Sequence, residues 1–113
     1  MPERIIHETT ARVLADRIAW ARSFRTRARG LIRRDLAVGA ALILEPTSQI
    51  HTFGMTYEID VLFCRSDWTV VHVIRNLRPN RVTRWVRACR RVVELPGGSV
   101  PPQVAVGDRL LVS

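Results

Sequence analysis

The stretch IHTFGMTYEIDVLF, from Ile50 to Phe63, places a histidine, a carboxylate and a sulfur-bearing side chain inside an otherwise apolar segment with strand character. The short run GMTYE interrupts this segment, which favours two strands joined by a turn. Because alternate residues of a strand point to the same face, His51, Phe53 and Met55 are expected to share one side. The candidate binding residues of this stretch are therefore His51, Thr52, Phe53, Met55 and Asp60.

His51 and Asp60 are also the catalytic candidates. If GMTYE is the turn, Asp60 lies near His51 or Phe53 on the neighbouring strand, depending on the register. A carboxylate beside an imidazole can orient the ring as a general base. In the structural alternative, Asp60 accepts backbone hydrogen bonds at the start of its strand, and His51 is a partly buried histidine with one partner. The sequence leaves both interpretations open.

The sequence contains no motif that is typical of a metal site or of a reactive cysteine. The spacing of His51, Asp60 and His72 matches no established metal-ligand motif, so neither a metal nor a cofactor is expected. Cys64 and Cys89 have no CxxC arrangement and no histidine at ligand spacing. We therefore expect reduced, structural thiols, because a free cysteine usually behaves as a small buried hydrophobe.

Length and composition favour a single globular unit. The chain has 113 residues, of which 47% are hydrophobic, and this predicts one domain spanning residues 1–113. The longest apolar run, Ala37 to Leu44, is too short to cross a bilayer, so no membrane span is expected. The amino-terminal MPERIIHETT lacks the apolar segment of a secretory signal, which predicts a cytoplasmic protein.

Short apolar segments separated by turn signals dominate the chain and predict strands. These strands are expected at Arg4–Glu8, Ala11–Ala15, Arg17–Ala21, Ala40–Glu45, Gln49–Phe53, Ile59–Cys64, Trp68–Leu77, Arg90–Pro96 and Asp108–Ser113, the first two forming a hairpin. One segment has helical spacing instead, with an apolar face of Phe24, Ala28, Leu31 and Ile32. The predicted fold class is α+β: a mostly antiparallel, barrel-like sheet with one packed amphipathic helix from Ser23 to Arg33.

The charge of the chain raises the question of a polyanionic partner. The formal net charge is +8, and all 18 basic residues are arginine, which fits a compositional preference as well as selection for phosphate contacts. The densest group consists of Arg78, Arg81, Arg84 and Arg87, the candidate polyanion-binding residues. Trp85 lies among them and could stack on a base, but it could equally join Val82, Val86 and Cys89 on the apolar face of a short helix.

Several motifs together resemble a known family. The helix-like RARGLIRR (Arg27 to Arg34) is similar to the R..GLM.R helix of the domain of unknown function 192 family. The Ile50–Phe63 stretch resembles that family's HTF.M...IDV.F segment, VVELPGGSV its VLE..AG strand and turn, and VAVGD its closing I..GD. The resemblance implies a compact, mostly β fold with one packed helix, and it implies no reaction. Many members carry an export signal or membrane anchor ahead of the domain, and neither is expected from the sequence as written, so the resemblance leaves localisation open.

Three functional hypotheses follow from these observations. The first is a non-enzymatic binding or accessory module for an unknown ligand or protein partner. The second is a small enzyme or metal-dependent hydrolase centred on His51 and Asp60. The third is a polyanion or nucleic-acid binder that uses the arginines between residues 75 and 91. Fold alone cannot choose among them, because similar small β folds host unrelated functions.

Overall fold

The computed structural model describes residues 3–23 and 36–113, and every regular element found there is a β-strand. The strands are β1 (Ile5–His7), β2 (Arg12–Ala15), β3 (Arg17–Ala21), β4 (Ala40–Leu44), β5 (Ile59–Cys64), β6 (Val70–Leu77), β7 (Arg91–Pro96) and β8 (Leu110–Val112). Each lies within a segment predicted from the sequence, and β1 and β2 form the expected hairpin. Within these described ranges there is no helix long and apolar enough to cross a membrane.

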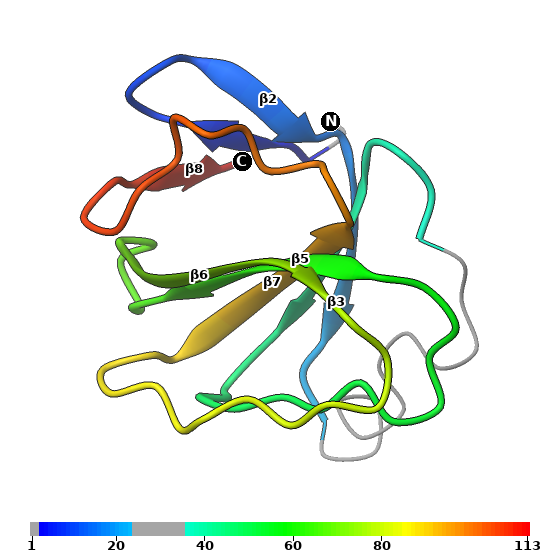
Figure 1. Cartoon of the computed structure of the whole chain (residues 1–113). Coiled ribbons are helices and arrows are strands. Elements are labelled where there is room, and N and C mark those ends of the chain that lie inside the picture. The colour runs from blue at the N-terminus through cyan, green and yellow to red at the C-terminus, as the bar shows by residue number, and fades with distance from the viewer. Residues whose placement is uncertain (1–2, 24–35) are drawn as a thin grey trace.

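The strands form two sheets (Figure 1). The smaller sheet has the order β2-β1-β8 and is drawn at the top of the figure. The larger sheet has the order β3-β4-β7-β5-β6. Its β3–β4 pairing is parallel, whereas β4, β7, β5 and β6 pair with one another antiparallel. Strand β7 therefore lies at the centre, hydrogen-bonded on both sides.

The larger sheet buries both of its faces. One face packs with the smaller sheet around Leu62, Val93 and Leu95 of the large sheet and Ile5 and Leu110 of the small one. The other face carries the buried side chains of Leu42, Leu44, Ile59, Val61, Phe63 and Val92, covered by Ile50, Met55, Val86 and Cys89. Because both faces are covered, the central strands are continuous apolar runs and do not alternate apolar and polar residues.

The predicted α+β class is wrong for the part of the chain that the structure describes. Residues 3–23 and 36–113 contain no helix, and the two sheets do not close into a barrel. The barrel prediction failed because short strands with turns fit two stacked sheets equally well, and the sequence does not reveal which strands form the edges. Apart from Ser23, the helix predicted from Ser23 to Arg33 lies outside the described residues.

Two local predictions are also wrong. Ile50–Phe63 is not a hairpin, because His51 forms an antiparallel bridge with Val82 and β5 pairs with β6 and β7. The segment Val82–Cys89 is not a helix. Its Val86 and Cys89 are buried as predicted, but Val82 and Trp85 are exposed, since Val82 bridges His51 and the N–H groups of Thr83 and Val86 bond to the loop that precedes β5.

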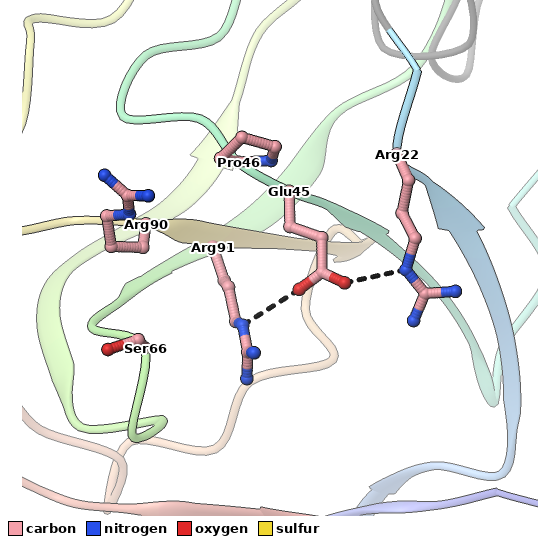
Figure 2. A pocket seen from close by; sticks show the side chains of 6 residues that line it. All are labelled: Arg22, Glu45, Pro46, Ser66, Arg90 and Arg91. Atoms are coloured by element: carbon pink, nitrogen blue, oxygen red, sulfur yellow. Dashed lines mark hydrogen bonds and ion pairs between the residues drawn. The ribbon is translucent and has the colours of Figure 1, made fainter.

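Glu45 connects three strands of the larger sheet (Figure 2). It follows β4 directly, and its two carboxylate oxygens lie 2.7 Å from Arg22 Nε, just beyond β3, and 2.8 Å from Arg91 Nε, in β7. The Arg22 guanidinium also lies over the Trp20 ring, and that of Arg91 over the Trp68 ring. Each of these arginines is thus held by a carboxylate at its edge and an aromatic ring at its face.

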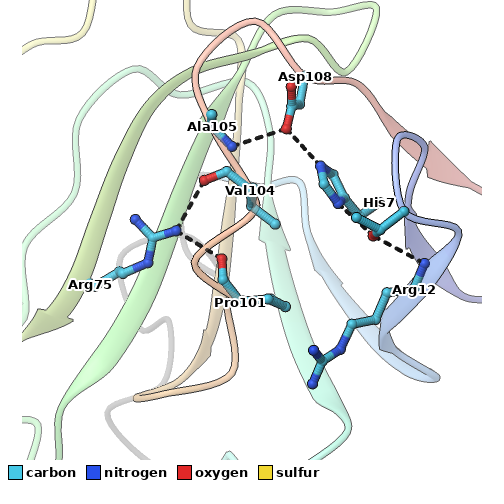
Figure 3. A network of polar contacts seen from close by, with 8 residues as sticks. His7, Arg12, Arg75, Pro101, Val104, Ala105 and Asp108 are labelled. Carbon is cyan, nitrogen blue, oxygen red and sulfur yellow. Dashed lines mark hydrogen bonds and ion pairs between the residues drawn. The ribbon is translucent and has the colours of Figure 1, made fainter.

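A buried histidine ties the smaller sheet to the last turn (Figure 3). His7 is fully buried, with Nε2 2.7 Å from the Asp108 carboxylate and Nδ1 2.7 Å from the Thr10 hydroxyl. A carboxylate only accepts hydrogen bonds, so Nε2 donates to Asp108. Asp108 also accepts from the backbone N–H of Ala105, and these two hydrogen bonds hold its pKa below the usual value. The network links β1 to the turn that precedes β8.

We expect Asp108→Ala to destabilise the fold by about 1–3 kcal/mol at neutral pH, because the buried His7 N–H loses its acceptor. The low pKa of Asp108 means that its contribution is present above pH 3.8 and is lost as the pH falls below that value. Urea unfolding at pH 7 and at pH 3 measures both effects. Asp16→Ala, which removes an exposed carboxylate, is the control, and equal stability of the two variants would contradict the proposed role.

Candidate functional site

Two loops meet beneath the larger sheet and bring the sequence candidates together. The backbone of residues 50–54 bonds to that of residues 80–83, through Thr52 N–H to Arg81 O at 2.8 Å and Thr83 N–H to Ile50 O at 3.0 Å. The buried Thr52 hydroxyl donates to Arg78 O at 2.7 Å and accepts from Arg81 N–H at 2.9 Å. Because these bonds are sheltered, they fix the two loops against each other.

The two loop segments carry exposed aromatic and apolar side chains. His51 lies opposite Val82 in the antiparallel bridge, so their side chains emerge on the same side. The His51 ring stacks on Phe53 with centroids 5.1 Å apart. Phe53 is 49% exposed, Val82 57% and Trp85 68%, which is unusual for large apolar side chains. The predicted grouping of His51 with Met55 is wrong, because Met55 is buried in the core.

Exposed arginines lie in the same loop segment as Val82 and Trp85. The exposed arginines are Arg78, Arg81, Arg84 and Arg87. The pKa of His72 is lowered by burial and, to a smaller extent, by the positive charge of Arg84. Residues 78–93 contain six arginines, and neither this segment nor residues 47–57 contains an aspartate or glutamate. The arginine–aromatic surface is defined here as His51, Phe53, Arg78, Arg81, Val82, Arg84, Trp85 and Arg87. Its charge is uniformly positive.

Asp60 has a structural position in the sheet. Ile59 pairs with Leu77 and Val61 with Ile74, so the β6 strand has an extra residue opposite Asp60. Such a bulge leaves backbone groups without ladder partners. The fully buried Asp60 carboxylate accepts from Asn76 N–H and from Val100 N–H, both at 2.8 Å. Both carboxylate oxygens are therefore occupied by backbone donors, as the structural alternative predicted.

The structure does not join His51 to Asp60. His51 accepts from Phe53 N–H through Nδ1 at 3.3 Å, but it is exposed, so the prediction of a partly buried histidine is wrong. Asp60 is buried within β5. His72 lies on β6 beside Phe63, with ring centroids 5.4 Å apart. Across residues 3–23 and 36–113, no three side chains of the metal-ligating types gather closely enough to hold an ion. His51, Asp60 and His72 therefore do not form one site.

The two cysteines are buried and unpaired. Burial is the largest cause that raises the pKa of both thiols, and the effect is strongest at Cys64 in the middle of the core. The thiolate is the reactive form of cysteine. Both residues therefore act as small apolar side chains at neutral pH.

Glu94 is a buried carboxyl group that the sequence analysis did not single out. It lies in β7 between Leu42 of β4 and Val61 of β5 and is only 3% exposed. Its Oε2 has no hydrogen-bond partner among the described residues, and burial raises the pKa of this carboxyl to about 8. The only sequence signal is a lone acidic residue inside the apolar run VVELP.

Comparison with known proteins shows which family this chain matches. The DUF192 family model, described as "Uncharacterized ACR", matches residues 5–112. The chain belongs to the DUF192 family. This confirms the resemblance seen in the sequence motifs, and the family description names no activity. No curated protein matches the chain significantly.

Two crystal structures of bacterial proteins have the same fold. One is a candidate transcription regulator from Sinorhizobium meliloti 1021, with a TM-score of 0.79 and 25% identity over 97% of this chain and 91% of that one. The other is a protein of unknown function from Novosphingobium aromaticivorans DSM 12444, with a TM-score of 0.80 and 18% identity over 98% of this chain and 84% of that one. The second likeness concerns the fold alone.

We expect Asp60→Asn to destabilise the protein by about 1–3 kcal/mol, because an amide cannot accept on both sides and one backbone donor loses its partner. Chemical unfolding at pH 7 measures the loss. Glu58→Gln is the matched control, since it makes the same acid-to-amide change at an exposed position two residues earlier. Unchanged stability of Asp60→Asn would show that these hydrogen bonds do not hold the bulge.

Glu94→Gln should flatten the pH dependence of stability. The unfolded chain releases this proton near pH 4.5, whereas the folded protein keeps it up to about pH 8. Stability is therefore greatest below the unfolded pKa and falls as the pH rises to about 8, at no more than about 1.4 kcal/mol per pH unit. Urea unfolding from pH 4 to pH 9 should show a smaller decline in the variant. Parallel curves would contradict the buried, protonated state.

Proposed function

We propose that this protein is a non-enzymatic binding module and that its partner is single-stranded nucleic acid, held on the arginine–aromatic surface. The observation that carries the proposal is the exposure of Phe53 and Trp85 among arginines with no acidic neighbour in either loop segment. Exposed aromatic rings cost free energy in water, so their presence on a rigid loop pair favours a partner that covers them.

The two residue types match the two parts of a nucleic-acid strand. Arginine guanidinium groups bind phosphates, and displacement of the counterions from the phosphate backbone supplies affinity. Aromatic side chains stack on bases of any sequence, because every base has a flat π face. A surface that combines both therefore binds a strand without reading its sequence. An acidic peptide would satisfy the arginines but would leave the exposed rings without a flat partner.

A single strand fits better than a duplex. Base faces are accessible for stacking only where they are unpaired, and the described residues include no helix that could enter a major groove. The loops are already fixed by the bonds of Thr52 and Thr83. Binding therefore orders side chains more than backbone, which lowers the entropic cost.

Other observations support a binding role. The similar protein from Sinorhizobium meliloti is described as a candidate transcription regulator. The enzymatic alternative is weaker, because the Asp60 carboxylate accepts two backbone hydrogen bonds and is not hydrogen-bonded to His51. A general base on His51 would need another group to orient it.

Binding is tested by fluorescence anisotropy with a labelled oligothymidine of about 12 nucleotides, a length within the range that small single-strand binding domains cover. We expect binding at low salt that weakens steeply as salt rises. Trp85→Ala and Phe53→Ala should each lose about 1–3 kcal/mol of binding free energy if one base stacks on each ring. The triple variant with Arg81, Arg84 and Arg87 changed to Gln should have a smaller salt slope.

The matched control is a triple variant with Arg4, Arg12 and Arg65 changed to Gln, which removes the same charge from exposed positions outside the surface. Val106→Ala removes an exposed apolar side chain elsewhere and should leave binding unchanged. The proposal fails if the two triple variants lose affinity equally, or if an acidic peptide or a duplex binds as tightly as the single strand. A sequence-selective complex that survives about 0.5 M salt would also contradict it.

A further inference from the structure

A second concentration of arginine lies in a cleft at the end of β4 (Figure 2). The cleft has a volume of about 310 Å³ and is lined by Arg22, Glu45, Pro46, Ser66, Arg90 and Arg91. Three guanidinium groups and one carboxylate give the lining a net charge of +2 from these residues. A volume near 300 Å³ is at the small end of the range for metabolite sites.

We infer that this cleft is a binding site for a small molecule that carries an oxyanion group, a carboxylate or a phosphate. The site is distinct from the arginine–aromatic surface and does not rest on the proposed nucleic-acid function. Three features of the lining support the inference: guanidinium donors without a protein partner among the described residues, a fixed guanidinium and a hydroxyl that lines the same cleft.

The donors belong to Arg90 and Arg91. Arg91 forms an ion pair with Glu45 through Nε, and the face of its guanidinium packs on the Trp68 ring. Its two terminal nitrogens have no partner in the part of the chain that the structure describes. The Arg90 guanidinium has none either, although its backbone is held by Cys64 O and by Thr47 N–H. A planar guanidinium presents its donors in a fork that matches the two oxygens of a carboxylate or phosphate.

The Arg91 guanidinium is positioned before a ligand arrives. Glu45 lies 2.8 Å from its Nε, and the Trp68 ring lies 4.5 Å below its central carbon. Trp68 is itself packed edge-on against Trp20, with centroids 6.3 Å apart. Because this side chain is held from two directions, binding an anion costs little rotamer entropy at Arg91.

The geometry also indicates where an anion would sit. Ser66 lies across the opening from Pro46, on the same side as Arg90, and Arg91 stands between them and Glu45 (Figure 2). An oxyanion bound by the terminal nitrogens of Arg91 would contact a different edge of that guanidinium from the one that faces Glu45. This arrangement keeps the acidic group from repelling the ligand while it orients the arginine. Figure 2 shows the Arg90 guanidinium pointing away from that of Arg91, so the exposed Arg90 side chain would turn toward the ligand.

The test uses inorganic phosphate, citrate and acetate as probes, with sodium chloride at matched ionic strength as the reference. Isothermal titration calorimetry measures affinity, and NMR of the arginine Nε–H groups shows which guanidinium groups respond. We expect selective shifts at Arg90 and Arg91, and a stronger response to either phosphate or citrate identifies the preferred oxyanion.

Arg90→Gln is the primary variant, because its guanidinium has no partner among the described residues and its removal leaves no group unpaired. It should weaken binding by roughly tenfold or more, the effect of losing a charge-assisted hydrogen bond. Arg91→Lys should weaken binding although it keeps the charge, because an ammonium lacks the planar fork. Arg4→Gln and Arg87→Gln, which remove exposed charges outside the cleft, should bind normally.

The inference is overturned if Arg90→Gln binds like the parent protein, or if the shifts are spread evenly over all exposed arginines as non-specific screening would produce. Absence of binding by all three probes at millimolar concentration would overturn it as well. Circular dichroism and a thermal melt confirm that each variant is folded. Because these probes and variants leave Phe53 and Trp85 untouched, the outcome does not depend on whether oligothymidine binds.

Discussion

Hydrogen bonding of β7 on both edges is the constraint on which the rest of this structure depends. β4 and β5 flank it, and its side chains Val92 to Leu95 are buried on both faces of the sheet. A strand in this position must be almost wholly apolar, because each buried polar group without a partner costs free energy. Glu94 breaks this rule. Its burial is tolerated because the carboxyl remains protonated to about pH 8, so that the sheet does not have to bury a charge.

His7 bonds the side chains of Thr10 and Asp108, but the buried side chains of Asp60, Thr52 and Thr83 are satisfied mainly by backbone groups. Asp60 accepts the two N–H groups of Asn76 and Val100, Thr52 bonds the backbone around Arg78 and Arg81, and Thr83 bonds Ile50. Such bonds attach irregular segments to the sheet where ladder pairing is absent. The bonds of Thr52 and Thr83 also fix the two loops that carry the exposed side chains of Phe53, Val82 and Trp85.

The sequence predicts the strands well and their partners poorly, for a physical reason. Apolar runs bounded by Gly, Pro or Asp are local signals, so β4, β5 and β7 could be located within about two residues. Pairing depends on contacts across the chain, and His51 meets Val82 where a hairpin with Asp60 was expected. The cleft was invisible for the same reason, since Arg22, Glu45 and Arg91 are scattered in sequence. The exposed arginines are the site candidates that could be located from composition, because a high density of arginine is a local property of the sequence.

The arginines of this protein fall into two physical classes, separated by what holds them. Arg22 and Arg91 are fixed by Glu45 and by tryptophan rings, and a fixed guanidinium can discriminate ligands by geometry. Arg78 and Arg87 project from an exposed loop, so their effect on a partner acts mainly through charge and is screened by salt. Net charge alone would treat both classes as one basic surface. The positions of Glu45 and the two tryptophans distinguish guanidinium groups that are held in place from those that contribute charge alone.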